Sequence, residues 1–312
     1  MNKKTVRKNI PAFQNFNRWS RKWKPPGFQG QSVFDIVQFI RHNFDMQGFY
    51  ERAAAISYNF IMSLPPTCLF IFTLIPNLPF FSKRGIRLQL HALIRDIIPS
   101  QVYNRQLISF VDSFIDGSKI GIMSFTVILS LFFASNGVMG LMRSFNRKDY
   151  IGFRTLKGIK QRMKAVGLTL MLFGLLLGTL LLLFLQTKIL RWMGVHNDSV
   201  TSLILVARWI AIGLLIFFSF GFIYRYAPST TKRWRLFSPG AVVATALSII
   251  VTVGFSFFVN NFGSYNILYG SIGSVMVIMI MVYLNSLAAF IGFMVNLSVH
   301  SLETRRERRN SK

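Results

Sequence analysis

Polar side chains recur at helical spacing inside stretches of this chain that are otherwise apolar. Their amide and hydroxyl groups can donate and accept hydrogen bonds, and an arginine can hold a phosphate through its planar guanidinium group. Two interpretations stay open, namely a lined cavity or hydrogen bonds between helices. In the first, the residues that bind a polar or anionic group are Arg52, Asn59, Ser63, Asn136, Arg143, Thr252, Ser256, Asn285 and Asn296.

Residues for covalent or metal chemistry are not grouped in this sequence. The four histidines, His42, His91, His196 and His300, fall in different segments, and no H-x-x-x-H, P-loop or G-x-S-x-G motif is present. A hydrolase or nuclease needs several such groups close together. We therefore predict that the chain is not an enzyme and has no catalytic residue, metal site or cofactor.

Six long apolar stretches contain or border these polar sets. None of them includes an Asp or Glu, although the chain has 10 acidic residues. About 20 apolar residues are enough for a helix to cross a hydrocarbon layer of ~30 Å. We therefore predict an all-α membrane protein with six transmembrane helices, at 53–79, 119–142, 165–186, 203–224, 239–261 and 270–298.

The distribution of basic residues orients these spans. The net charge is +26, and 27 of the 36 Lys and Arg lie before the first span, after the last, or in the second and fourth connections. Basic residues favour the cytoplasmic side of a membrane. The predicted domains are a basic cytoplasmic arm at 1–48, a transmembrane domain at 49–300 and a basic cytoplasmic tail at 301–312, so both termini are cytoplasmic.

Two connections between spans are amphipathic. Residues 83–117 place apolar side chains at helical spacing on both sides of Pro99, which predicts an extracytoplasmic hairpin of helices too short to span. The basic cytoplasmic loop 143–164 alternates cations with apolar residues, a composition that suits anionic headgroups. The predicted partners are membrane lipids, anionic ones above all, and not nucleic acid.

Prolines and glycines mark special helix geometry within two of the spans. Pro65 and Pro66 remove two backbone donors, which predicts a kink or break near the middle of the first span. Broken helices form substrate sites in some transporters, whereas other prolines only bend a packed helix. Gly174 and Gly178 form a G-x-x-x-G motif, a hypothesis for a face that joins identical chains.

Three motifs in this sequence resemble those of a known family. They are Arg-Ala-Ala-Ala-Ile-Ser-Tyr at 52–58 with the proline pair, Tyr-Arg-Tyr-Ala-Pro at 224–228 before Pro239 and Gly240, and Tyr-Gly-Ser-Ile-Gly at 269–273 before Tyr283 and 292–296. In this order they resemble the first helix, the joint between the fourth and fifth helices, and the last helix of the YihY/virulence factor BrkB family. The resemblance covers roughly residues 45–300.

Membership of that family would imply six helices in a bacterial inner membrane. Members have been labelled ribonuclease or virulence factor, and a role with envelope lipids or lipopolysaccharide is suggested for some. One departure concerns the last helix, where the family often has Gly-Ala-Glu-Leu-Asn. Here Met294 stands at the glutamate position, so a mechanism that uses that carboxylate is not available to this chain.

The leading functional hypothesis is movement of a lipid or lipid-linked anion through a polar groove between helices. Arg52 and Arg143 would attract the headgroup phosphate, and the other polar residues would line the path. Two alternatives stay open, a transporter of small solutes or ions and a scaffold for envelope proteins that transports nothing. A lateral opening to lipid favours the first hypothesis, a closed central cavity the second and a dry interior the third.

Overall fold

The computed structural model of the protein describes residues 27–43, 46–74, 108, 112, 120–146, 158–192, 198–230, 233–261 and 265–310. Seven α-helices lie within these residues, and six of them are long and apolar enough to cross a membrane. The prediction of an all-α fold with six spans is confirmed. The predicted hairpin at 83–117, apart from residues 108 and 112, and most of the arm at 1–48 lie outside the described residues, so both stay predictions.

One short helix precedes the six long ones. It is α3 (Val33–Asn43), and it begins with a reciprocal cap in which Ser32 Oγ accepts from the Asp35 backbone N at 3.1 Å and donates to Asp35 Oδ2 at 2.7 Å. The long helices are α4 (Met46–Leu74), α7 (Ile120–Phe145), α8 (Ile159–Trp192), α9 (Asp198–Tyr226), α10 (Pro239–Asn261) and α11 (Tyr265–Asn310).

Two helices extend well past the apolar stretches that predicted them. α8 begins at Ile159 rather than 165, and α11 continues to Asn310 rather than ending at 298. Hydropathy marks the part of a helix that can lie in lipid, but Lys, Arg and Glu are themselves good helix formers. A helix therefore continues where its apolar stretch ends, and both ends of the predicted loop 143–164 lie in helices, in α7 up to Phe145 and in α8 from Ile159.

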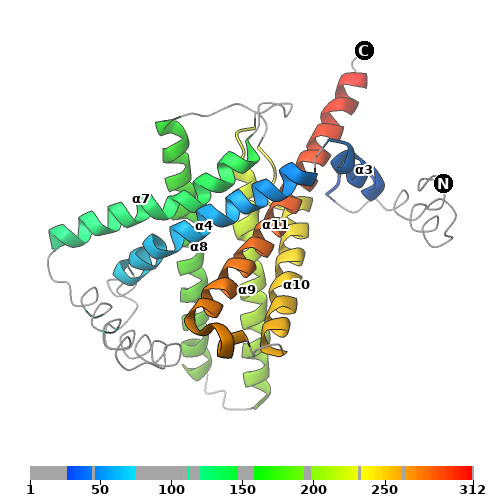
Figure 1. Cartoon of the computed structure of the whole chain (residues 1–312). Coiled ribbons are helices and arrows are strands. Elements are labelled where there is room, and N and C mark those ends of the chain that lie inside the picture. Colours follow the sequence, from blue (N-terminus) through cyan, green and yellow to red (C-terminus); the bar gives the residue numbers. More distant parts are fainter. Residues whose placement is uncertain are drawn as a thin grey trace.

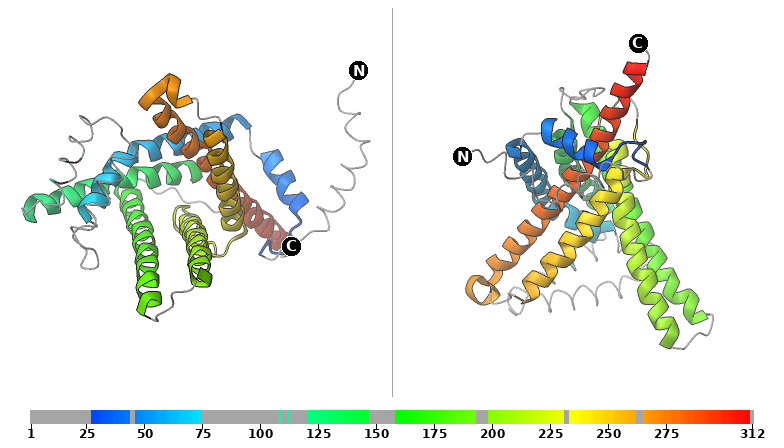
Figure 2. Two further views of the ribbon diagram at one scale, coloured as in Figure 1. Left: turned by 90° about the horizontal axis from the view of Figure 1, so that it is seen from below. Right: turned by 90° about the vertical axis from the view of Figure 1, so that its right-hand side faces the viewer.

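The long helices form three pairs that meet at one end and separate at the other. α4 packs against α7, α8 against α9, and α10 against α11, and these pairs also contact one another. Figure 2 shows the pairs radiating from a common region, near the linker between α9 and α10. In Figure 1 the α4–α7 pair lies across the other helices rather than parallel to them.

We call the meeting place the convergent end and define it by its buried side chains. It combines the first part of α4, the last turns of α7 and α9, the first turns of α8 and α10, and the middle of α11. Its larger members are Ile56, Met142, Phe145, Leu168, Tyr224, Trp234, Phe290, Phe293 and Leu297.

The rest of the long helices form what we call the divergent arms. These expose large apolar side chains, among them Phe125, Trp209 and Phe257 at 66%, 70% and 70% of their possible area. In water such a surface would be unfavourable, but in a bilayer lipid tails cover it. The exposed apolar surface therefore agrees with a membrane location.

Aromatic rings fill the centre of the convergent end. The rings of Phe145 and Phe293 are stacked, with centroids 4.2 Å apart and planes 2° from parallel. Phe290 and Trp234 lie 5.9 and 5.7 Å from Phe293, measured between ring centroids. Each such aromatic pair adds about 0.5–1.5 kcal/mol beyond the area it buries. This cluster therefore joins α7, α11 and the α9–α10 linker.

Glycines let two of the pairs approach at backbone distance. A Cβ atom added to Gly292 would lie 2.5 Å from the carbonyl oxygen of Gly240, so α10 and α11 cross where neither has a side chain. A Cβ atom on Gly137 would lie 2.7 Å from Ser63 Oγ, which places α7 directly on α4. Small residues at such crossings are the usual means of close helix packing in membranes.

The proline pair does not break its helix. α4 is continuous from Met46 to Leu74 with Pro65 and Pro66 inside it, so the helix is not broken there, while a kink, the other predicted outcome, stays a prediction. The long contact with α7 and the bond from Thr67 Oγ1 to the Ser63 carbonyl (2.7 Å) hold this part of the chain helical. The missing N–H groups leave the carbonyls of the preceding turn without their usual donors.

Gly174 and Gly178, the predicted oligomer motif, lie in α8. A Cβ atom added to either would meet nothing within 4 Å. The surface around both glycines is open in the single chain. Association through it stays a prediction.

Candidate functional site

Two of the sequence-predicted residues lie between α4 and α7. Asn59 Nδ2 donates to the Ala55 carbonyl at 2.7 Å, and a Cβ atom on Gly140 would lie 2.6 Å from Asn59 Cγ. Ser63 is buried, and its hydroxyl donates to the Phe60 carbonyl at 2.7 Å. Both side chains thus donate hydrogen bonds to carbonyls of their own helix, and both pack against glycines of α7.

Asn136 connects α7 to α8 through an arginine that the sequence analysis did not select. Arg162 Nη1 donates to Asn136 Oδ1 at 2.7 Å, and Nη2 donates to the Phe132 carbonyl. The Arg162 guanidinium carbon lies 3.6 Å from the centre of the Phe132 ring. A stacked and hydrogen-bonded guanidinium of this kind fixes one helix to another.

A third group joins α10 to α11. Ser248 Oγ donates to Asn285 Oδ1, and Asn285 Nδ2 donates to the Met281 carbonyl at 3.0 Å and, more weakly, to Thr252 Oγ1 at 3.4 Å. Ser256, one turn further along α10, is exposed. The predicted polar face of α10 is therefore partly an interhelical contact and partly open.

Asn296 is buried, and its side-chain amide forms hydrogen bonds at the start of α10. Its Oδ1 accepts from the Gly240 backbone N at 2.7 Å, and its Nδ2 donates to Ser238 Oγ at 2.9 Å. Ser238 itself precedes Pro239, the first residue of α10, and caps the helix. A helix begins with four N–H groups that lack partners inside it, and α11 supplies one acceptor from a different part of the chain.

The two predicted headgroup arginines lie at the convergent end in different surroundings. Arg52 on α4 is half-buried, and its guanidinium carbon lies 5.8 Å from the centre of the Phe290 ring. Arg143 is exposed in the last turn of α7. Arg52 is therefore partly fixed by the aromatic cluster, whereas Arg143 is accessible on the protein surface.

The polar residues selected from the sequence thus fall at separate interfaces. Their contacts lie between α4 and α7, between α7 and α8, and between α10 and α11. These contacts support the interpretation as hydrogen bonding and packing for most of them. The structure does not gather them around one groove.

An apolar cavity lies instead where α4, α7, α9 and α11 meet. Its volume is about 310 Å³, and Asn285 and Ser286 are the polar residues among those that line it. The other lining residues are Ile56, Phe60, Leu141, Phe220, Ile223, Met281, Val282 and Ala289. The sequence analysis missed it because each of these residues is an ordinary member of an apolar span.

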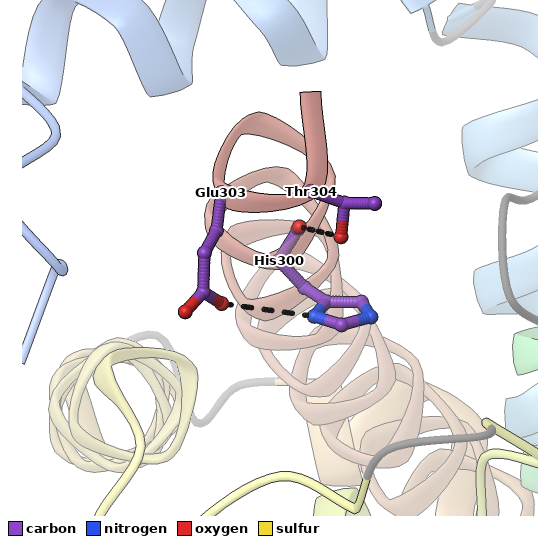
Figure 3. A network of polar contacts seen from close by, with 3 residues as sticks. All are labelled: His300, Glu303 and Thr304. Carbon is purple, nitrogen blue, oxygen red and sulfur yellow. Dashed lines mark hydrogen bonds and ion pairs between the residues drawn. The ribbon is translucent and has the colours of Figure 1, made fainter. Parts of the chain in front are cut away.

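A second cavity, of about 410 Å³, lies beside the cap of α10 and the polar end of α11. There His300 Nδ1 lies 3.9 Å from Glu303 Oε2, and Thr304 Oγ1 donates to the His300 carbonyl at 3.0 Å (Figure 3). The Trp234 ring is 6.4 Å from the His300 ring. Across the described ranges, no three His, Cys, Asp or Glu side chains are placed to hold a metal ion.

Comparison with known proteins assigns the chain to a family. Residues 40–312 match the family described as "Virulence factor BrkB". The chain belongs to that family. The resemblance seen in the sequence is confirmed, and its motifs at 224–228 and 292–296, with Pro239 and Gly240, lie at or beside the convergent end.

Several BrkB relatives are similar over most of their length. The putative ribonuclease-like protein YfkH of Bacillus subtilis is 29% identical over 271 residues, which are 85% of this chain and 96% of that protein. A UPF0761 membrane protein of Pseudoalteromonas atlantica is 25% identical over 88% of both chains. One of Coxiella burnetii is 23% identical over 86% of this chain and 94% of its own. No solved structure matches this BrkB chain.

Proposed function

We propose that this BrkB-family protein binds and moves a lipid or a lipid-linked anion across the bacterial inner membrane. The observation that carries the proposal is the apolar cavity among α4, α7, α9 and α11. Its volume of about 310 Å³ is at the small end of ligand pockets, which span roughly 300–1,000 Å³. Its lining suits an acyl chain far better than an ion or a sugar.

The separation of the three helix pairs supports the same proposal. A lipid enters a protein sideways from the bilayer, so it needs apolar surface that continues from the lipid to the cavity. Phe60 and Met281 line the cavity, and both α4 and α11 continue from there into arms that expose apolar side chains. Each CH₂ group kept out of water contributes about 0.8 kcal/mol, so a continuous apolar path avoids a large barrier.

The headgroup would be held at the convergent end by Arg52 and Arg143. A guanidinium group can hold two phosphate oxygens at once, whereas a lysine ammonium acts as a point charge. We expect Arg52→Lys and Arg143→Lys to insert normally but to lose activity and to retain less co-purified anionic lipid. Equal activity and equal bound lipid in both variants would remove these residues from the proposal.

The orientation belongs to the proposal as well. Both termini should be cytoplasmic, because 27 of the 36 basic residues fall on that side. Reporter fusions at Lys312 and next to Pro99 should then report opposite compartments. A periplasmic Lys312 would invert the arrangement and place the convergent end on the outer side.

The central test fills the cavity. Ser286 is buried, lines the cavity and bonds only within its own helix, to the Val282 carbonyl at 2.8 Å. Ser286→Leu should occupy the cavity without unfolding the protein, and it should reduce translocation of a fluorescent phospholipid in reconstituted vesicles about tenfold. Ser219→Leu is the matched control, because Ser219 also bonds within its helix (Leu215 carbonyl, 2.7 Å) but is not among the lining residues.

Three results would contradict the proposal. The parent protein could move no labelled lipid, the Ser286→Leu variant could match the parent, or the Ser219→Leu variant could lose as much activity as Ser286→Leu. A protein that binds no lipid and only assembles with other envelope proteins would fit the scaffold alternative instead.

A further inference from the structure

The linker between α9 and α10 forms a third cavity with the first turns of α8. Its volume is about 360 Å³, and none of its lining residues is shared with the apolar cavity. Among the described residues that line it, three are cations and none is acidic. The lining residues are Lys164, Arg225, Tyr226, Pro228, Ser229, Thr230 and Arg233.

The three cations are held in place around this cavity. Lys164 Nζ donates to the Pro228 carbonyl at 3.1 Å. The guanidinium carbons of Arg225 and Arg233 lie 5.7 and 5.6 Å from the centre of the same ring, that of Tyr226. Like charges that are fixed near one another repel, and a bound anion removes that repulsion.

Two polar atoms at this cavity are buried without a hydrogen-bond partner. They are Arg225 Nε and Ser229 Oγ. Ser229 is only 6% exposed, and its backbone N is fixed by Asn146 Oδ1 at 2.7 Å, so the residue cannot easily turn outward. A buried polar atom without a partner costs about 1–3 kcal/mol, and here two donors of this kind border one basic cavity.

We propose that this cavity is a binding site for a phosphate group. A phosphate has several acceptor oxygens, which the guanidinium groups of Arg225 and Arg233, the Lys164 ammonium and the Ser229 hydroxyl can share. The phosphate can belong to a lipid headgroup or to a free anion. Only the first source rests on the proposed lipid function, and the binding site itself does not.

The test measures binding to the full-length protein in a neutral detergent by titration calorimetry. The probes are inorganic phosphate, dihexanoyl phosphatidylglycerol and the net-neutral dihexanoyl phosphatidylcholine. Arg233→Gln removes a charged guanidinium group and Ser229→Ala removes a hydroxyl donor, and each should weaken phosphate binding at least about tenfold, as expected for the loss of one charge-assisted hydrogen bond. Arg233 is exposed, and Ser229→Ala only removes an unpartnered atom, so both variants should fold.

The matched control is Arg235→Gln. Arg235 is exposed in the same linker, two residues from Arg233, and it lines the neighbouring cavity but not this one. It should bind phosphate as the parent does. An equal loss in Arg235→Gln would show general attraction to a basic surface and would overturn the site, as would unchanged binding in both Arg233→Gln and Ser229→Ala.

The probes separate the two sources of phosphate. If phosphatidylglycerol binds more tightly than inorganic phosphate, and phosphatidylcholine binds more weakly than phosphatidylglycerol, the phosphate belongs to a lipid headgroup. If inorganic phosphate and phosphatidylglycerol bind equally tightly, the ligand is a free phosphate anion. If no probe binds the parent, the site is refuted even where the vesicles show lipid translocation. If phosphate binds and no lipid moves, only the proposed function fails.

Discussion

The two ends of α7 show how differently one helix can be stabilised. Near its end, Leu141, Met142 and Phe145 are at most 1% exposed and face other helices. Near its start, Phe125 and Ile128 expose 66% and 68% of their area. Both halves carry large apolar residues, although the half that ends at Phe145 also holds Asn136 and Arg143, so the apolar residues alone do not show which half is buried. What differs is the surrounding medium, protein at the convergent end and lipid along the divergent arm.

This difference separates the region that holds the helices together from the region that faces lipid. In lipid the transfer of an apolar side chain from the bilayer to the protein gains little, so specific packing and hydrogen bonds must hold the helices together. Those interactions are concentrated at the convergent end. The divergent arms expose large apolar side chains instead, and the apolar cavity lies where the two regions meet.

The largest expected effect comes from removing one aromatic ring near either end of α7. Phe145→Ala should destabilise the protein by about 3–5 kcal/mol, because a stacked and fully buried ring is lost. Phe125→Ala, on the same helix, should change stability little, because lipid replaces the ring. Thermal unfolding in detergent measures both, and similar losses would show that the arms are as tightly supported as the convergent end.

The next effect concerns the crossing of α10 and α11. Gly292→Ala would place a methyl group against the Gly240 carbonyl and the Tyr224 hydroxyl, so the backbones must separate. We expect a loss of about 3 kcal/mol, the upper end for overpacking. Gly174→Ala is the control in an open arm and should be neutral. Full stability in Gly292→Ala would mean that the backbones of α10 and α11 are far enough apart at the crossing to admit a methyl group.

A smaller loss is expected at the cap of α10. Asn296→Ala leaves the Gly240 N–H without its acceptor and removes the Asn296 donor from the Ser238 hydroxyl, which should cost about 1–2 kcal/mol. Ser298→Ala is a close control, because Ser298 is also buried but bonds only within α11, to the Met294 carbonyl at 2.7 Å. Equal midpoints for the two variants would show that the cap contributes nothing to stability.

The smallest effect on stability is expected where the two regions join in α4. Replacing Pro65 and Pro66 with Ala restores donors for the carbonyls of Ile61 and Met62, so the unfolding midpoint should stay equal or rise slightly. Insertion should be normal, yet we expect lower activity in a complementation assay, because the local helix shape changes. Parental activity would show that the prolines are incidental to function.

The sequence predicted the spans well because apolar length is a property of each stretch alone. It also placed Asn285 and Asn296 correctly on faces that meet another helix. It could not show that Asn296 caps α10, because the Gly240 N–H that it binds lies 56 positions away along the chain. Arg162 was missed for a related reason, since it was assigned to a loop by its charge, while the structure places it inside α8.

The basic cavity was beyond the sequence analysis altogether. Lys164 and Arg225 are brought together by the return of α9 to the start of α8, and neither belongs to a periodic pattern with the other. The α9–α10 linker has no periodicity of its own, so its cations were counted only as topology signals. A buried hydroxyl without a partner, such as that of Ser229, is visible only once the fold is known.

The length of α11 connects the apolar cavity to a distant part of the protein. Its 46 residues make a rod of roughly 70 Å, more than twice the thickness of the hydrocarbon layer. The cavity residues Met281–Ala289 lie near its middle, and α3 packs on its far end, where Arg305 lies over the Phe39 ring at 5.3 Å. A tilt of this rod at the cavity would therefore displace α3, which contacts it about 30 Å further along the helix.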